Sequence, residues 1–465
     1  MESKQYVVAL EISSSKIVGV VGEPNTNGGV NVVDIEAERG VDCVKYGCVQ
    51  NVEETKLRIN RVISRLESHI APKKITGVYV GISGRSMRNY EMQFSTSFDE
   101  ESMITENVIE SLRKRFYSEA EVQGDILDVI PCQYFIDNNE TSNPIGTYGS
   151  SIKVVFNGII AKSTLKMNIR RSLESQQYDI KGYVITPLAV AEQVLSNEER
   201  QLGCMLVDFG AETSTVSIYR GGVLRYLVTL PMGSRLITRD LTNLNMLEDA
   251  AEEIKKTTGN AIASESGRSI LVEGIQSSEV QNYVIARSEE IVANINEQIS
   301  YSGIPRENIA AGIVLVGGGA LLNGFGRLLE RMTKLKVRNG GLSPRIRLYS
   351  QAANGMEYTE VISILAHAAS TIGVNESCVQ DPAAVPDEVV VPPVESEVKG
   401  DSDVKIEEEI EKPVDSGVKA PKSTETHSPN KFFRFYQNFK KRTTELLEGS
   451  DDSFDDDDNS ARGNK

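Results

Sequence analysis

Two stretches of this chain begin with the same pattern of strands and tight turns. In the first, YVVALEI (6–12) and KIVGVVGE (16–23) are runs rich in β-branched residues that three serines separate, which predicts two adjacent strands. In the second, about two hundred residues later, CMLVDFG (204–210) leads through a short polar turn into TVSIYRGG and then RYLVTLPMG. The recurrence predicts two copies of one nucleotide-binding α/β half.

Helices and further strands follow each copy. Apolar residues at helical spacing predict a helix over 51–70, before a strand over 76–83. The remaining expected elements are strands over 30–36, 269–275 and 312–316, and helices over 234–244, 246–258 and 278–302. The block between the copies, 84–162, is expected to be a small α+β insertion. Its expected elements are a charged helix over about 99–120 and strands over 128–136 and 152–161.

Composition places the chain among soluble globular proteins and argues against several functions. Of 465 residues, 40% are hydrophobic and 25% charged, and the net charge of -16 disfavours broad nucleic-acid binding because phosphate would be repelled. Five cysteines form no CxxC pair, and only three histidines accompany them, so we expect reduced thiols rather than disulfides or a structural zinc site. We expect neither a secretory signal nor a membrane span, since no run of about 20 apolar residues occurs.

The composition changes after residue 375. Residues 376–430 are rich in proline, acidic and small residues, with few large apolar side chains. This predicts a disordered acidic linker, because little buried surface would offset the entropy of ordering the chain. Residues 449–465 are expected to be an acidic disordered tail, and the segment between these two regions is basic and aromatic.

Residues 431–448 (KFFRFYQNFKKRTTELLE) are expected to form an amphipathic helix on an anionic membrane surface. At 100° per residue, the large apolar side chains fall within an arc of about 160°, and two basic side chains border it. The predicted membrane-binding residues are Phe432, Phe433, Phe435, Tyr436, Phe439, Leu446 and Leu447 in the arc, and Lys440 and Arg442 at its borders. The alternative is a helix that docks on the protein's own body or in a groove of a partner.

The two polar turns and a later glycine turn predict a nucleotide site. Small residues let backbone N–H groups approach a phosphate, and an acidic residue near the end of the preceding strand can hold Mg²⁺ through water. In the third turn, glycines leave space for an adenosine. The predicted phosphate-binding residues are Ser13, Ser14, Ser15, Lys16, Gly210, Ala211, Glu212 and Thr213, the metal ligands Glu11 and Asp208, and the adenosine turn Gly317, Gly318 and Gly319. The alternative at each hairpin is an ordinary turn that favours serine and glycine.

Two residues of the helix over 246–258 are further candidates for nucleotide binding. Glu252 and Lys255 are three residues apart and share a helix face, from which they can reach ribose hydroxyls and the edge of a base. The alternative is an exposed ion pair of the ordinary i,i+3 kind. Spacing alone favours the ion pair.

Together these motifs resemble the actin, hexokinase and heat-shock-chaperone ATPase superfamily, and within it the FtsA family of bacterial cell-division actin homologues. ALEISSSKIVGVVGE resembles the first phosphate motif, LVDFGAETSTVSIYRGG the second, and GIVLVGGGALLNGF the adenosine motif. TPLAVAEQVLSNEERQLG resembles the inter-domain helix, and the block 84–162 resembles the insertion particular to FtsA. The resemblance covers about residues 5–375 and 431–448.

The resemblance implies a duplicated actin-like (ribonuclease H-like) α/β fold of four subdomains around a nucleotide cleft. Subdomain IA is expected over 1–83, 163–198 and 341–375, and the inserted subdomain IC over 84–162. Subdomain IIA is expected over 199–225 and 302–340, and subdomain IIB over 226–301.

The function implied by the resemblance is that of a membrane tether. Such a protein binds ATP and Mg²⁺, polymerises with itself on the cytoplasmic face of the bacterial cell membrane at the division site, and anchors FtsZ filaments there as a peripheral membrane protein. The FtsZ C-terminal peptide is expected on subdomain IIB, with Arg287 as a candidate contact. Other division proteins are further candidate partners, and nucleic acid is not expected.

Three departures from the family pattern bear on catalysis. Glu11 and Ser13 stand where aspartate and glycine are usual, and Ala211 and Glu212 where two glycines are common. Thr186 stands where heat-shock chaperones and MreB carry the glutamate that positions the attacking water. We therefore expect slow ATP hydrolysis at most. The alternatives are an active ATPase or sugar-type kinase of the same fold, and an actin-like adaptor of pilus assembly.

Overall fold

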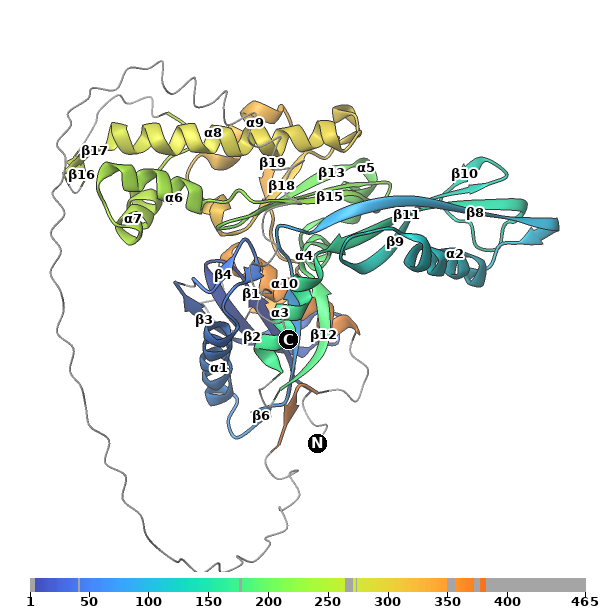
Figure 1. The fold of residues 1–465 in the computed structure, drawn as a ribbon, viewed down its shortest axis with the longest axis horizontal. Coiled ribbons are helices and arrows are strands. Elements are labelled where there is room, and N and C mark those ends of the chain that lie inside the picture. The colour runs from blue at the N-terminus through green and yellow to red at the C-terminus, as the bar shows by residue number, and fades with distance from the viewer. Residues whose placement is uncertain are drawn as a thin grey trace, which may run out of the picture. The chain divides into compact units, whose positions relative to one another are not determined.

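The computed structural model describes residues 5–40, 42–174, 178–263, 271–272, 274–348, 356–371 and 377–381. All of them belong to one compact unit that ends at Glu388. The predicted helix over 431–448 and the tail over 449–465 lie outside the described residues, as does the predicted linker beyond residue 381. Within the described part, Figure 1 shows two main sheets with helices packed against them.

The first copy of the strand pattern forms a six-stranded sheet in the order β12-β7-β1-β2-β3-β20. Its strands are β1 (Val7–Ile12), β2 (Lys16–Pro24), β3 (Val30–Arg39), β7 (Gly77–Ile82), β12 (Asp179–Ile185) and β20 (Arg347–Leu348). β1 pairs antiparallel with β2, so that Glu11 lies opposite Val18, and parallel with β7. Because antiparallel neighbours need only a short connection, the three serines suffice to join β1 to β2.

Helices flank this sheet on both faces. They are α1 (Val52–His69), α3 (Ser163–Leu173), α4 (Thr186–Val194) and α10 (Thr359–Thr371). α1 begins after Asn51, whose side chain caps the first turn. Two glycines of β2 locate the helices: a Cβ at Gly19 would meet Val62 of α1, whereas a Cβ at Gly22 would meet Leu365 of α10. Since these glycines point to opposite faces, α1 and α10 enclose the sheet between them.

The second copy and the insertion share one nine-stranded sheet in the order β10-β9-β11-β8-β15-β14-β13-β18-β19. Its strands are β8 (Arg88–Met103), β9 (Asp125–Ile136), β10 (Asn139–Thr141), β11 (Tyr148–Ala161), β13 (Cys204–Phe209), β14 (Ser214–Arg220), β15 (Val223–Leu230), β18 (Ile313–Val316) and β19 (Val337–Asn339). The insertion joins where Arg88 of β8 pairs with Val228 of β15. It has its own core, which includes Phe94, Phe116 and Phe156. The insertion is thus a subdomain whose strands extend the second sheet.

The helices of this part differ from the sequence prediction in two places. They are α2 (Glu106–Glu119) in the insertion, and α6 (Arg235–Leu241), α7 (Glu248–Thr258), α8 (Ser277–Tyr301) and α9 (Phe325–Thr333) in the second half. The start predicted for α2, at about residue 99, is wrong because β8 continues to Met103, which pairs with Tyr148. The predicted strand over 269–275 is represented among the described residues by a short hairpin. Its strands are β16 (Leu271–Val272) and β17 (Ile275–Gln276).

The ordered body continues past residue 375. β21 (Val379–Gln380) pairs antiparallel with β6 (Lys74–Ile75), and the Cys378 N–H donates to the Tyr6 carbonyl at 2.9 Å. The predicted start of the linker at 376 is therefore too early, because these backbone hydrogen bonds hold 377–381 on the first half. No hydrophobic pattern indicates this pairing, since a two-residue strand is too short to show a period.

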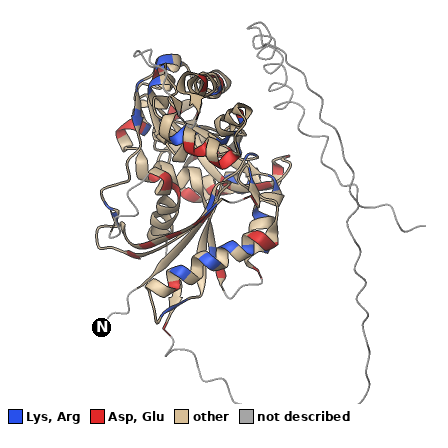
Figure 2. Ribbon diagram, turned by 90° about the vertical axis from the view of Figure 1, so that its left-hand side faces the viewer, with Lys and Arg blue, Asp and Glu red and all other residues tan. Residues whose placement is uncertain are grey.

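The cysteines, the helices and the surface charges of the described residues bear on the expectations from composition. All five cysteines lie among them and all are free, as expected for thiols without a disulfide framework. No helix in the described part is long and apolar enough to cross a membrane. Acidic and basic residues are interspersed on the side of the body drawn in Figure 2.

Candidate functional site

The first polar turn joins β1 to β2. Ser13 donates its N–H and its Oγ–H to the Lys16 carbonyl, at 3.0 and 2.9 Å. Ser14 is buried, and its Oγ accepts the Gly47 N–H at 2.9 Å, whereas Ser15 is exposed. Gly47 lies in a small hairpin made of β4 (Val44–Lys45) and β5 (Cys48–Val49). The turn is thus closed by its own hydrogen bonds and is held against this hairpin.

The second polar turn joins β13 to β14 and has the same compact form. The Gly210 N–H donates to the Thr213 carbonyl at 2.9 Å. The start of α6 lies against this turn, where the Ser234 N–H donates to the Gly210 carbonyl at 3.0 Å and the Arg235 N–H to the Ala211 carbonyl at 2.7 Å. These bonds satisfy two carbonyls of the turn and fix its conformation relative to α6.

The third turn, Gly317–Gly319, follows β18 and packs on the end of β13. Gly317 has φ = 91°, and a Cβ there would lie 2.5 Å from Asp208 Oδ1 and from the Phe209 carbonyl oxygen. A Cβ at Gly319 would lie 2.8 Å from the Phe209 ring. At Gly318, by contrast, a Cβ would meet no atom within 4 Å. The outer two glycines are therefore required by close packing, and the middle one faces open space, as a ligand-binding turn needs.

Three acidic side chains from distant parts of the chain meet beside these turns. Glu11 is the next-to-last residue of β1 and is 4% exposed, Asp208 is the next-to-last residue of β13, and Glu360 comes from the first turn of α10. The Glu360 carboxyl interacts electrostatically with those of both Glu11 and Asp208. Glu11 Oε2 and Asp208 Oδ1 are buried without a hydrogen-bond partner among the described residues. Such oxygens fit a hydrated cation, which would supply the missing partners.

Burial and the proximity of like charges raise the pKa values of these three carboxyls. Burial, followed by the charge of Glu360, raises the pKa of Glu11 to about 8. Burial, followed by the charge of Asp208, raises the pKa of Glu360 to about 8. Burial and then the charge of Glu11 raise the pKa of Asp208 to about 6. At neutral pH without a bound cation, the cluster therefore retains protons.

We expect the cation-free protein to lose stability as the pH rises from about 4.5 to 8. Glutamates with a folded pKa near 8 bind more protons in the native than in the unfolded state, so stability is fully present below about 4.5 and falls as the pH rises through 8. The midpoint of thermal unfolding in EDTA should fall by several degrees over this pH range. This corresponds to a loss of unfolding free energy on the order of one to a few kcal/mol.

Glu360→Gln should flatten this dependence, because it removes one titrating carboxyl and its repulsion. Glu357→Gln is the matched control on the same segment. Although burial opposes it, Arg39 lowers the pKa of Glu357, so this carboxyl titrates below the tested range. If the unfolding midpoint fell with pH by the same slope in wild type and in Glu360→Gln, the raised pKa values assigned to the cluster would be wrong.

Glu212 of the second turn reaches across to the first half. It is 3% exposed, and its Oε2 accepts the Tyr46 N–H at 2.7 Å. Its Oε1 accepts hydrogen bonds from Arg235 at 3.4 Å and from Arg239 at 3.2 Å. The predicted phosphate-binding residue is thus itself held as an anion. The sequence indicated that Glu212 is unusual there, but did not identify these partners.

The predicted pair Glu252 and Lys255 is an ion pair in the structure, at 2.6 Å. Thr238 joins it by donating to Glu252 at 2.6 Å and accepting from Lys255 at 2.9 Å. Lys255 is 6% exposed, and its burial lowers its pKa although Glu252 opposes the change. The ion pair that spacing favoured is therefore present, with Lys255 buried and the Glu252 side chain 35% exposed. Nucleotide contact by this pair stays a prediction.

Arg287, the candidate contact for a peptide partner, lies on α8 and is engaged within its own subdomain. Its guanidinium donates to Asp240 of α6 through Nε at 2.5 Å and Nη2 at 2.9 Å, and to Glu290 at 2.6 Å. Its side chain is 14% exposed. The sequence did not indicate the pairing with Asp240, because this residue lies on another helix. Peptide contact by Arg287 stays a prediction.

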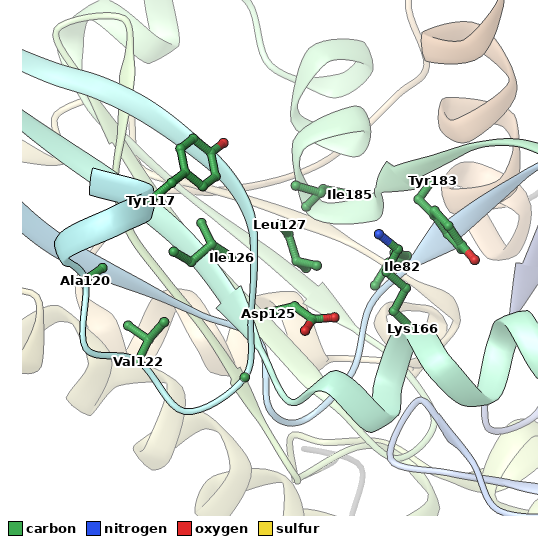
Figure 3. Close-up of a pocket in the computed structure, with 11 residues that line it drawn as sticks. Ile82, Tyr117, Ala120, Val122, Asp125, Ile126, Leu127, Lys166, Tyr183 and Ile185 are labelled. Atoms are coloured by element: carbon green, nitrogen blue, oxygen red, sulfur yellow. The ribbon is translucent and has the colours of Figure 1, made fainter. Parts of the chain in front are cut away.

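A separate cavity of about 590 Å³ lies where the insertion meets the first half. Figure 3 shows its lining. The insertion contributes Tyr117, Ala120, Val122, Gly124, Asp125, Ile126 and Leu127, and the first half contributes Ile82, Lys166, Tyr183 and Ile185. None of the predicted nucleotide-binding residues lines this cavity.

Comparisons with known proteins agree with the fold and the motifs. A family model described as "Cell division protein FtsA" matches residues 205–366. A curated relative of that name from Porphyromonas gingivalis is 31% identical over 345 residues, which cover 71% of this chain and 72% of the relative. The chain belongs to the FtsA family of cell division proteins.

Two further relatives with the same name are similar over most of the chain. The protein from Neisseria meningitidis is 28% identical and the match covers 75% of this chain and 88% of that protein. The protein from Escherichia coli is 27% identical, with 72% and 84% covered. The predicted resemblance to the FtsA family is therefore confirmed.

A solved structure supports the actin-like fold independently. A chain of the PilM-PilN type IV pilus biogenesis complex superposes with a TM-score of 0.56 at 16% identity, covering 79% of this chain and 99% of that one. At this identity the likeness concerns the fold alone. The predicted actin-like α/β fold is confirmed.

Proposed function

We propose that this FtsA-family protein binds a nucleotide and tethers FtsZ filaments to the cytoplasmic face of the bacterial cell membrane at the division site. The observation that carries the proposal is the convergence of three glycine- and serine-rich turns on one acidic cluster, within a chain of a cell-division family. The segment 431–448 would hold the protein on an anionic membrane as a peripheral protein, and the body would polymerise with itself.

The described residues fit the nucleoside and the cation. Gly318 would lie against the adenosine, since nothing occupies the space beside it. The turns at 13–16 and 210–213 would hold phosphates, and the unpartnered oxygens of Glu11 and Asp208 would bind Mg²⁺ through water. Bound Mg²⁺ would neutralise phosphate charge.

Hydrolysis of ATP is expected to be slow. Thr186, the first residue of α4, is buried and carries a hydroxyl where related ATPases position water with a carboxylate. A hydroxyl is a far weaker base than a carboxylate, so it would not remove a proton from the attacking water. We therefore propose that nucleotide binding serves assembly rather than turnover.

Co-sedimentation with liposomes tests the tether. The full-length protein is expected to bring FtsZ into the pellet with vesicles that contain anionic lipid. A variant without residues 431–465 should leave both proteins in the supernatant while its thermal unfolding remains unchanged, because the deleted residues lie beyond the body. Pelleting of FtsZ that does not depend on these residues would refute the tether.

A charge swap tests the role of Arg287 in binding the FtsZ C-terminal peptide. Arg287→Glu should weaken binding, but it also places a third acid beside Asp240 and Glu290. The double variant Arg287→Asp with Asp240→Arg restores the ion pair between α6 and α8 with the charges exchanged. Fluorescence anisotropy with a labelled FtsZ tail peptide should show binding lost in both variants if Arg287 contacts the peptide.

The two roles of Arg287 give different results in this test. If peptide binding returns in the double variant together with thermal stability, Arg287 only positions the two helices. The contact would then lie elsewhere on residues 226–301.

A further inference from the structure

One anion-binding site in the cleft is already filled by the chain itself. The two oxygens of Glu212 receive a backbone N–H from Tyr46 and guanidinium groups from Arg235 and Arg239, at 2.7 to 3.4 Å. The carboxylate is 3% exposed. Two arginines and a backbone N–H directed at one buried anion form the kind of donor set that proteins use for phosphate.

This site lies where the tips of the two polar turns meet. Ser14 at the tip of the first turn accepts the Gly47 N–H at 2.9 Å, and its carbonyl accepts from Arg235 at 3.4 Å. Glu212 at the tip of the second turn binds the neighbouring residue, Tyr46, of the same hairpin. The third turn, at Gly317, lies instead at the base of the second turn, against Asp208. A phosphate chain that starts from the third turn therefore ends towards the tips.

The position of Glu212 has a chemical consequence for the ligand. A third phosphate reaching the tips would need the same arginines, and would bring its negative charge next to a carboxylate that is already buried there. A ligand with two phosphates would not need these arginines and would not bring its charge next to Glu212. The donors around Glu212 suit a terminal phosphate, but the Glu212 carboxylate already occupies the position between them.

We propose that Glu212 takes the place of a terminal phosphate, so that the cleft favours nucleoside diphosphates over triphosphates. This inference rests on the proposed nucleotide binding and specifies the ligand class. It also means that the link from the second turn to Tyr46 forms without a third phosphate. The two halves are then joined at these turns by the side chain of Glu212.

Calorimetry of ADP and ATP with Mg²⁺ tests the proposal on the full-length protein. Wild type should bind ADP at least tenfold more tightly than ATP. In Glu212→Ala, which empties the site but keeps both arginines, the ratio should shift towards ATP by at least tenfold. Glu212→Gln retains the size of the side chain without its charge, and should shift the ratio by a smaller factor in the same direction.

Glu248→Ala is the matched control. Glu248 also pairs with Arg235, at 2.7 Å, but it lies outside the cradle and its side chain is 44% exposed. This variant should keep the ADP-to-ATP ratio within about twofold of wild type, because a solvent-exposed ion pair contributes little. Because Glu212→Ala removes the carboxylate that Arg235 and Arg239 share, thermal unfolding is measured beside calorimetry, and ATP should stabilise this variant more than ADP does.

The possible results separate this proposal from nucleotide binding itself. Equal affinities for ADP and ATP in wild type, or a ratio that Glu212→Ala leaves unchanged, would overturn the role of Glu212 while nucleotide binding stands. Binding of ATP by Glu212→Ala alone would support that role and refute ATP binding by the natural chain. Failure of both proteins to bind or be stabilised by either nucleotide would overturn both proposals.

Discussion

Phe435→Glu combined with Phe439→Glu is expected to release the protein from anionic membranes. Both side chains lie in the apolar arc of residues 431–448, at the positions predicted to enter the bilayer surface. Each buried phenylalanine contributes about 1.5 to 3 kcal/mol. Loss of both, with two carboxylates in their place, should reduce membrane partitioning by on the order of 100-fold or more.

The control keeps the charge change and moves it to the polar face. Gln437→Glu with Asn438→Glu also adds two negative charges, but at 100° per residue both positions fall outside the apolar arc. Co-sedimentation with anionic liposomes should show a loss of at most about 30-fold for this pair, since two charges near the surface are together worth about 2 kcal/mol. Equal losses in the two double variants would mean that charge, rather than apolar insertion, determines binding. Full pelleting of the Phe435→Glu, Phe439→Glu protein would refute the membrane prediction.

Gly318→Val should abolish or greatly weaken nucleotide binding without unfolding the protein. A Cβ at Gly318 meets no atom within 4 Å, so the fold has room for the side chain. The branched side chain would then occupy the space proposed for adenosine, where valine has few rotamers with which to withdraw. We expect at least a tenfold loss of ADP affinity by calorimetry.

A smaller substitution tests whether this effect is steric. Gly318→Ala adds one carbon in the same direction and should weaken binding less than valine. Thermal unfolding of both variants should stay close to that of wild type. If Gly318→Val binds ADP as wild type does, the third turn is not part of the site.

Local features of the fold followed from the sequence because they depend on neighbouring residues. The strands β1, β2, β13 and β14 occur at the predicted places, since β-branched runs and short polar turns are properties of contiguous residues. The glycine turn after β18 was also predicted. By contrast, no local pattern indicates that Glu360 would join Glu11, because an acidic residue in the first turn of a helix is common.

Long-range contacts of the site were not predictable in the same way. Glu212 meets Tyr46, which is 166 residues away, and Arg287 is paired by Asp240 on another helix. The insertion meets the second copy through the pairing of Arg88 with Val228, which leaves no signal in either strand. Such contacts depend on how the two halves pack, and hydrophobic periodicity carries no information about that.

The strand β21 determines where mechanical load would enter this molecule. The Cys378 carbonyl accepts the Thr76 and Gly77 N–H groups at 2.9 and 3.2 Å, and its own N–H binds Tyr6. A pull on the chain beyond residue 381 therefore acts first on these backbone bonds, at the entry of β1 and β7 into the first sheet. The polar turn at 13–16 follows the other end of β1, whereas the turn that bears Glu212 follows β13 of the second sheet. A tethered body would thus carry tension through its first sheet before any load reaches the turn that bears Glu212.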